Sequence, residues 1–326
     1  METRQLGFTD LHFSTIGLGA WAMGGGGYVF GWGPQDDAES IATIHRALDE
    51  GINWIDTAPG YGRGHSEEVV GKALVGRRHQ VYIATKCGIH VLPNGELTFR
   101  LKRDSVRQEI EDSLRRLRTD VIDLYQIHWP RPDEDIEEAW GVIADAIRAG
   151  KIRYGGVSNF NISQMQRLQA IHPIASLQPP YSMLNRDIES EILSYCATHK
   201  IGVIVYSPME RGLLTGKITR ERIQAMPEDD HRKRYAPFQE PQLSVNLRLV
   251  EQLRPIAERN GKTLAQLALA WVLRRPEVTG AIAGARRPEQ VSELVGASGW
   301  KLSTADLEEI ETLLTQRQKA LAEMAR

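Results

Sequence analysis

Four titratable side chains lie at the ends of three successive apolar segments of the sequence. They are Asp56, Tyr61, Lys86 and His128. The segments span residues 52–56, 81–86 and 121–128. In a closed parallel barrel the carboxyl ends of the strands face the same side, so three such strands would bring the four side chains together. We therefore treat them as one candidate site.

The types of these side chains suggest proton transfer to a substrate oxygen. A tyrosine is a poor proton donor at neutral pH because its unperturbed pKa is about 10. An ammonium group beside Tyr61 would lower the pKa of the phenol, and a carboxylate would keep that ammonium charged. We therefore expect Tyr61 to act as general acid, tuned by Lys86 and Asp56, while His128 orients the oxygen or relays the proton. Hydride transfer to a carbonyl needs such an acid, because the developing alkoxide must be protonated.

Length and composition favour a single globular domain over residues 1–326. The chain is 41% hydrophobic and 25% charged, with a net charge of -2. Such a charge gives no general attraction to nucleic acid or to anionic membranes. The first residues lack an apolar signal core, and no apolar run approaches the ~18 residues that span a membrane. We expect a cytoplasmic protein.

The two cysteines, Cys87 and Cys196, form neither a disulfide framework nor a metal-ligand cluster. Their number favours a reducing compartment. Cys87 follows Lys86, but adjacent side chains of a strand point to opposite faces. We therefore expect Cys87 to pack in the core.

Short β-branched segments alternate with longer amphipathic ones along nearly the whole chain, which favours a parallel sheet covered by helices. The predicted strands span residues 16–19, 52–56, 81–86, 121–127, 153–157, 174–178, 201–206 and 278–283. The predicted helices span residues 36–50, 66–74, 103–117, 133–149, 162–170, 188–199, 245–259, 263–274, 288–295 and 304–325. Eight strands with intervening helices predict an α/β fold, a (β/α)8 TIM barrel with extra C-terminal helices.

Three segments fall outside this alternation. Residues 1–13 contain the turn-like pair Thr9-Asp10, and we expect a hairpin that closes the bottom of the barrel. The glycine-rich residues 24–33 and the polar residues 226–242 are expected to be irregular. Long loops of this kind are usually functional.

Residues 17–22, Gly-Leu-Gly-Ala-Trp-Ala, fit the dinucleotide fingerprint G-x-G-x-x-G/A. That motif must open a helix. Here four glycines at 24–27 and Pro34 soon follow, and these residues would break a helix. The sequence therefore argues against a Rossmann domain.

Several longer motifs carry a resemblance that spans most of the chain. They are DTAPGYG at 56–62, GHSEEVVGKA at 64–73, DVIDLYQIHWP at 120–130, GKIR at 150–153, GVSNF at 156–160, QPPY at 178–181 and RGLLTGK at 211–217. In these motifs and their order the chain resembles bacterial aldo-keto reductases of the general-stress-protein and glycerol-dehydrogenase type.

The resemblance implies a reductase of aldehydes and ketones with Tyr61 as proton donor and Asp56, Lys86 and His128 completing a tetrad. It also implies a nicotinamide held by its carboxamide and stacked on Tyr206. The implied cofactor-binding residues are Gly19, Ala20, Trp21, Asp56, Ser158, Asn159, Gln178, Tyr206, Ser207, Leu213, Gly216, Lys217, Gly284, Arg286, Gln290 and Glu293. An aromatic face suits a flat ring, and cations suit phosphate.

The cofactor implied is NADPH (NADP+ when oxidised), with NADH less favoured. We expect Arg286 to bind the adenosine 2′-phosphate, because a guanidinium matches phosphate geometry; Arg287 and Lys217 are nearby candidates. The chain departs from several branches of the family, which have arginine at the position of Gln290 and asparagine at that of Leu294.

We expect a small carbonyl or alcohol as substrate, in a pocket formed by Trp21, Tyr61, His128 and Trp129, and a monomer or weak homo-oligomer. Two alternatives remain open at this stage. Relatives of this fold that associate with potassium channels bind the cofactor and act mainly through partners, so a nucleotide-sensing regulatory subunit is one alternative; the intact tetrad permits it but does not favour it. A metal-dependent hydrolase using Asp56 and His128 lacks a plausible set of three ligands, and no metal is expected.

Overall fold

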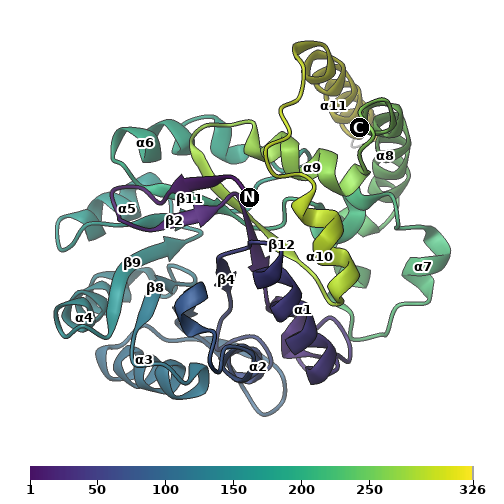
Figure 1. The fold of residues 1–326 in the computed structure, drawn as a ribbon. Coiled ribbons are helices and arrows are strands. Elements are labelled where there is room, and N and C mark those ends of the chain that lie inside the picture. Colours follow the sequence, from purple (N-terminus) through teal and green to yellow (C-terminus); the bar gives the residue numbers. More distant parts are fainter. Residues whose placement is uncertain (325–326) are drawn as a thin grey trace.

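Eight parallel strands close into a barrel in the computed structural model, which describes residues 1–324 (Figure 1). In order around the barrel they are β3 (Ile16–Gly19), β4 (Trp54–Asp56), β5 (Tyr82–Cys87), β8 (Ile122–Ile127), β9 (Ile152–Ser158), β10 (Ser176–Gln178), β11 (Gly202–Val205) and β12 (Val278–Gly284). The last strand pairs with the first, from Ala281 opposite Ile16 to Gly284 opposite Gly19. The predicted barrel and its eight strands are confirmed.

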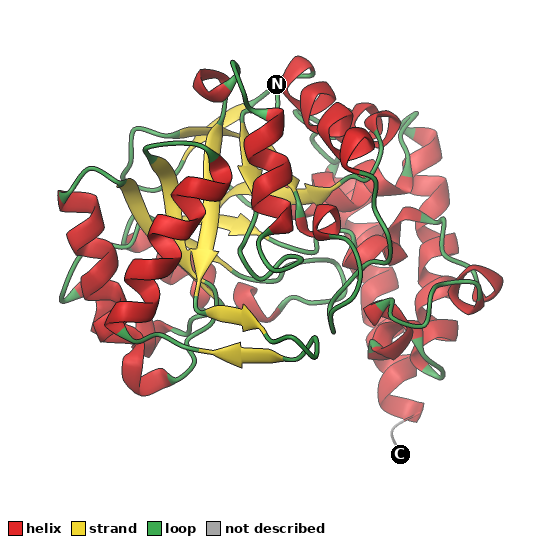
Figure 2. Cartoon of the chain, turned by 90° about the horizontal axis from the view of Figure 1, so that it is seen from below, coloured by secondary structure: helices red, strands yellow, loops and turns green. Residues whose placement is uncertain are grey.

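Helices follow the strands and surround the barrel (Figure 2). They are α1 (Asp37–Asp49), α2 (His65–Ala73), α3 (Arg103–Leu117), α4 (Ile136–Arg148), α5 (Ile162–Gln169), α6 (Ile192–Thr198), α7 (Arg220–Gln224), α8 (Gln242–Arg259), α9 (Leu264–Leu273), α10 (Pro288–Val295) and α11 (Thr304–Met324). The predicted starts at 133 and 188 are wrong, because residues 133–135 and 187–189 form separate 3-10 turns. Helix α8 begins earlier than predicted, since Glu240 accepts a hydrogen bond from the amide of Ser244 near its start. The predicted end of the terminal helix at Ala325 lies outside the described residues.

The N-terminal hairpin closes the bottom of the barrel as predicted. Its strands are β1 (Thr3–Gln5) and β2 (His12–Ser14). Phe13 of β2 stacks on Trp54 inside the barrel, with ring centroids 4.7 Å apart. This apolar plug leaves the carboxyl ends of the strands as the open face.

A second hairpin at that open face was not predicted. Strands β6 (Ile89–Val91) and β7 (Leu97–Phe99) pair antiparallel and project beyond β5 (Figure 2). An Asn94-Gly95 pair lies in the turn, a strong local hairpin signal. The strands are too short for a periodic pattern to reveal them.

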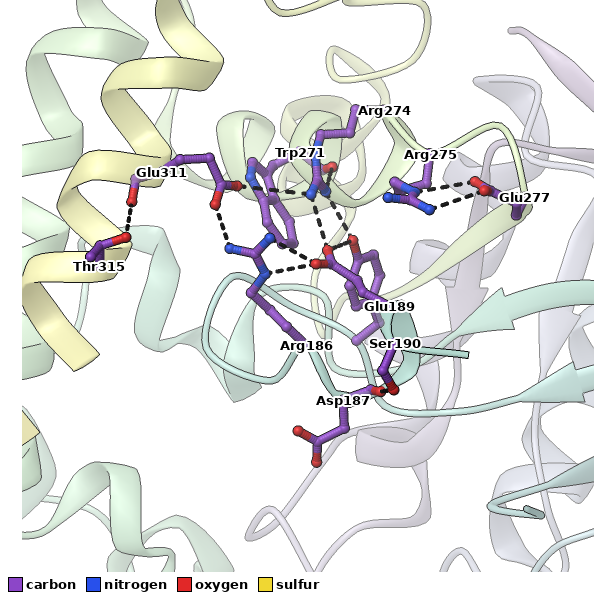
Figure 3. A network of polar contacts seen from close by, with 11 residues as sticks. Arg186, Asp187, Glu189, Ser190, Trp271, Arg274, Arg275, Glu277, Glu311 and Thr315 are labelled. Carbon is purple, nitrogen blue, oxygen red and sulfur yellow. Dashed lines mark hydrogen bonds and ion pairs between the residues drawn. The ribbon is translucent and has the colours of Figure 1, made fainter. Parts of the chain in front are cut away.

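A polar network joins α9 and α11 to the segment between β10 and α6 (Figure 3). Glu189 accepts hydrogen bonds from Arg186 at 2.7 Å and from Arg274 at 3.0 Å. Arg186 also donates to Glu311 of α11 at 2.6 Å. Arg274 lies 3.6 Å from the ring centroid of Trp271. The C-terminal helices are thereby fixed to the side of the barrel.

Candidate active site

The structure brings together the four side chains that the sequence singled out. Lys86 is fully buried, and its ammonium donates to Asp56 Oδ1 at 2.7 Å, to the carbonyl of Thr57 at 3.0 Å and to the Tyr61 hydroxyl at 3.2 Å. The other oxygen of Asp56 accepts from Gln178 Nε2 at 2.8 Å. The His128 ring meets the Tyr61 ring edge to face, with centroids 5.9 Å apart.

The loop after β4 aims Tyr61 at the centre of the barrel mouth. Gly62 has a φ of 64°, and a Cβ there would lie 2.1 Å from the carbonyl oxygen of Gly24. Only glycine fits that position. The tight approach locks the loop against the start of residues 24–33, and Trp21 stacks on the Tyr61 ring at 6.0 Å.

The pKa of Tyr61 is shifted in the direction opposite to our prediction. Burial, followed by the nearby Asp56 carboxylate, raises the pKa of Tyr61 well above its usual value of 10. Burial also lowers the pKa of Lys86, and the attraction of Asp56 opposes that shift. Sequence reasoning counted the neighbouring ammonium but not the removal of water, which disfavours phenolate. Tyr61 is therefore a protonated acid at neutral pH.

His128 is neutral at physiological pH. Burial, and then the positive charge of Lys86, lowers the pKa of His128 well below 6.5. Its backbone amide donates to the carbonyl of Cys87, which fixes the end of β8 beside β5. A neutral imidazole has one ring N–H, which is able to donate a hydrogen bond. Unlike a charged imidazolium, it does not compete with the Tyr61 phenol as a proton donor.

The predicted nicotinamide residues form a connected row across β9, β10 and β11. Asn159 donates to the carbonyl of His128 at 3.1 Å and accepts from the Tyr206 hydroxyl at 2.8 Å. Ser158 Oγ donates to the carbonyl of Gln178 at 2.8 Å. Because Gln178 also bonds Asp56, the amide-bearing wall and the Asp56–Lys86–Tyr61 group form one network.

A cavity of about 580 Å³ opens above this network, within the usual size range for small-molecule sites. Its wall includes most of the predicted cofactor residues. They are Gly19, Trp21, Asp56, Ser158, Asn159, Gln178, Tyr206, Ser207, Lys217, Gly284, Arg286, Gln290 and Glu293. Amide side chains and the flat ring of Tyr206 at the ends of β9 to β11, with cations after β11 and β12, are the groups that a dinucleotide needs.

Three predicted cofactor residues do not line the cavity. The carbonyl of Ala20 accepts from Ser66 Oγ at 2.8 Å, beneath the wall. Leu213 packs with Phe238 in a small apolar cluster. A Cβ on Gly216 would lie 2.5 Å from Leu264, so this glycine shapes the loop. The sequence predicted that these three residues contact the cofactor. In the structure the carbonyl of Ala20, the side chain of Leu213 and the backbone of Gly216 pack against other parts of the protein instead.

The two cations expected at the adenosine end have protein partners. Arg286 donates to the carbonyls of Trp32 at 3.1 Å and of Pro34, and to Gln35 Oε1 at 2.6 Å. Lys217 pairs with Glu293 at 2.7 Å. Arg286 thus ties residues 32–35 to the end of β12, a role that the sequence did not reveal.

Residues 24–33 and 226–242, both expected to be irregular, meet across the cavity. The amide of His231 donates to the carbonyl of Gly31 at 3.4 Å, and Arg234 donates to that of Val29 at 2.9 Å. Arg232 lies 4.4 Å from the ring centroid of Trp32. Together the two segments form a strap over the site.

The side of the cavity where the sequence predicts the substrate is apolar and aromatic. Trp21, Tyr61, His128 and Trp129 line it, together with the aromatic Tyr28 and Trp32 of residues 24–33. The sequence did not single out Phe30, Ile89, Leu97, Phe99 and Arg131, which also line it. Leu97 and Phe99 come from the unpredicted hairpin. Arg211 and Arg232 also line the cavity; Arg211 stands in the RGLLTGK motif, but nothing in the motif says where its side chain lies.

Among residues 1–324, no helix is both long and apolar enough to cross a bilayer. Within the same range, no three His, Cys, Asp or Glu side chains gather closely enough to hold a metal ion. Cys87 is buried in the core, as predicted.

Comparisons with known proteins agree with the geometry. The model of the aldo/keto reductase family matches residues 15–315. The chain is 44% identical to aldo-keto reductase YhdN of Bacillus subtilis (96% of this chain, 94% of the relative) and 38% identical to an NADH-specific methylglyoxal reductase of Escherichia coli (98% and 99%). The solved glycerol dehydrogenase AKR11B4 of Gluconobacter oxydans superposes with a TM-score of 0.88 at 40% identity, covering 97% of this chain and 95% of that one. Members of this family are oxidoreductases that act on carbonyl groups with nicotinamide cofactors, and the chain belongs to the aldo/keto reductase family.

Proposed function

We propose that this protein reduces aldehydes or ketones to alcohols with NADPH, reversibly, and that Tyr61 donates the proton. The observation that carries the proposal is the contact of the Tyr61 hydroxyl with Lys86, itself bonded to Asp56, at the base of the cavity. The contacts of this site give no specific support to a purely nucleotide-sensing role.

When bound, the reduced nicotinamide supplies a hydride to the carbonyl carbon. Tyr61 gives its hydroxyl proton to the carbonyl oxygen as negative charge develops there. The ammonium of Lys86, 3.2 Å from the phenol oxygen, stabilises the phenolate that remains. His128 donates a hydrogen bond that orients the substrate oxygen, and Trp21 and Trp129 hold the apolar part of the substrate. Solvent then returns a proton to Tyr61.

This reaction predicts multiple turnovers with a carbonyl substrate. Purified protein mixed with NADPH and a panel of short sugars, glyceraldehyde, methylglyoxal and aromatic aldehydes should oxidise many equivalents of NADPH per protein and form the matching alcohols. A sensing subunit would bind the cofactor and stop after one equivalent or none. That outcome across the panel, with NADH run in parallel, would contradict the proposal.

The preference for NADPH is proposed to depend on Arg286. Its guanidinium lies at the cavity wall and would exchange the carbonyls of residues 32–35 for the 2′-phosphate. The related Escherichia coli enzyme is named as NADH-specific, so this preference needs a direct test. Arg286→Ala should weaken NADPH binding by about tenfold or more and NADH binding much less, because charge-assisted bonds to phosphate are lost.

Arg234→Ala is the matched control. Arg234 also holds the strap, through the carbonyl of Val29, but does not line the cavity. Its loss should change the affinities for NADPH and NADH by the same factor. If Arg286→Ala lowers the affinities for NADPH and NADH by the same factor, the 2′-phosphate role is refuted. The effect of the substitution would then come only from loosening the strap.

A further inference from the structure

The cavity wall carries more positive than negative side chains. Its cations are Arg131, Arg211, Lys217, Arg222, Arg232 and Arg286, against the carboxylates of Asp56 and Glu293. Both carboxylates are already paired, with Lys86 and Lys217 at 2.7 Å each. An excess of one charge in a cleft with apolar walls raises the local concentration of the opposite ion. The site therefore favours anionic ligands.

Five of these cations belong to the cofactor side. Arg211, Lys217, Arg222, Arg232 and Arg286 all follow β11 or β12, as do the predicted phosphate-binding residues. Arg131 stands apart from them. It follows β8, three residues after His128, on the wall that also contains Trp129 and Phe99.

The guanidinium of the exposed Arg131 lies near two aromatic rings. It lies 5.4 Å from the ring centroid of Trp129 and 5.8 Å from that of Phe99. Among residues 1–324, no carboxylate lies within ion-pair distance of it and no oxygen accepts a hydrogen bond from its side chain. A cation–π contact attracts a guanidinium to the aromatic rings while leaving its N–H groups available for a bidentate anion.

From this placement we propose that Arg131 is a specificity-determining residue, which binds a carboxylate or similar anion on the substrate. The inference rests on the carbonyl reduction proposed above. The wall that contains Tyr61 and Arg131 also contains the apolar Ile89 and Leu97, which suit a flat or apolar spacer. The substrate class assigned is an aldehyde that carries an anionic group across such a spacer from its carbonyl.

Two substrates of nearly equal shape test this assignment. Para-formylbenzoate and para-formylbenzamide both present an aldehyde on an aromatic ring, but only the first has a negative charge at the far end. The wild-type protein should show the higher kcat/KM for the benzoate, with a preference that shrinks as salt is added. Arg131→Met should raise KM for the benzoate by about three- to tenfold, with kcat nearly unchanged, and leave the benzamide within about twofold. Arg131→Lys should recover part of the preference.

Arg100→Met is the control for removing an exposed arginine beside the hairpin, since Arg100 follows β7 directly but does not line the cavity. It should leave both substrates unchanged. If Arg131→Met affects both substrates equally, or neither, the assignment is overturned while carbonyl reduction stands. If the wild-type protein reduces neither these aldehydes nor any other with NADPH or NADH, the proposed function is wrong. The assignment of Arg131, which rests on it, is then wrong as well.

Discussion

Burial sets the protonation states of the two side chains that we propose contact the substrate oxygen. The pKa of Tyr61 is raised well above 10, and the pKa of His128 is lowered well below 6.5, in both cases chiefly by removal from water. Both side chains are therefore neutral over the physiological range. The phenol is ready to give a proton, and the imidazole does not gain one as the pH falls moderately.

These shifts predict a flat pH profile for reduction. Between about pH 6 and pH 8 neither group changes charge in the free protein, so kcat/KM should vary by less than about twofold, as that ratio reports the pKa values of the free enzyme. Activity in the oxidation direction should rise toward alkaline pH, because it needs the phenolate. Steady-state rates over this range check both statements. An inflection near pH 6.5 that disappears in His128→Gln would show that His128 titrates normally.

At this scale the sequence predicted which residues meet but not their electrostatics. Asp56, Tyr61, Lys86 and His128 come together as expected because strand ends of a parallel barrel must converge. The direction of the shift at Tyr61 was wrong, since the depth of burial depends on the loops above it. Arg286 lines the cavity, but its bonds to the carbonyls of Trp32 and Pro34 and to the side chain of Gln35 depend on a loop path that composition does not encode.

Glycines in the barrel strands show how an element makes room for its neighbours. Gly17 of β3 lies against Trp54 of β4, and a Cβ there would come within 2.1 Å of the indole ring. Trp54 is fully buried beneath Phe13 and donates to the carbonyl of Ser14 at 2.8 Å, so it has no room to move. The first glycine of the misleading fingerprint is thus explained by packing.

Gly17→Ala should therefore destabilise the protein by about 1–3 kcal/mol or more, the usual cost of overpacking a core. Gly141→Ala is the matched control. Gly141 lies inside α4 and a Cβ there meets nothing within 4 Å, so this change should stabilise by roughly 0.5–1 kcal/mol. Urea unfolding of the wild type and both variants measures the change in the free energy of unfolding that each substitution causes. Equal stabilities for Gly17→Ala and the wild type would contradict the packing explanation.

Periodic elements were predictable and short or irregular ones were not. Each barrel strand carries a run of buried β-branched or apolar residues, and each long helix an apolar stripe, so their order followed from the sequence. The β6–β7 hairpin has three residues in each strand, too few for a period. The strap is held by contacts to backbone carbonyls, such as Arg234 to Val29, which any sequence offers.

At the scale of the whole molecule, the barrel separates support from chemistry. The N-terminal hairpin fills one end with Phe13 and its neighbours, and the network around Glu189 fastens the C-terminal helices to the outside (Figure 3). The other end holds the tetrad, the strap and the β6–β7 hairpin around one cavity. This division allows loops to set substrate and cofactor preference while the strands keep the tetrad fixed.

The central claim is that Tyr61 supplies the proton in carbonyl reduction. Tyr61→Phe removes one hydroxyl and keeps the ring against Trp21, so NADPH affinity, measured by fluorescence titration, should stay within about twofold of wild type. Turnover of an aldehyde that the wild-type protein reduces should fall by about a hundredfold or more. Tyr154→Phe, which removes a hydroxyl bonded to Asp10 beside the N-terminal hairpin, should leave turnover unchanged. Tyr61→Phe protein that binds NADPH and reduces aldehydes at the wild-type rate would contradict the account.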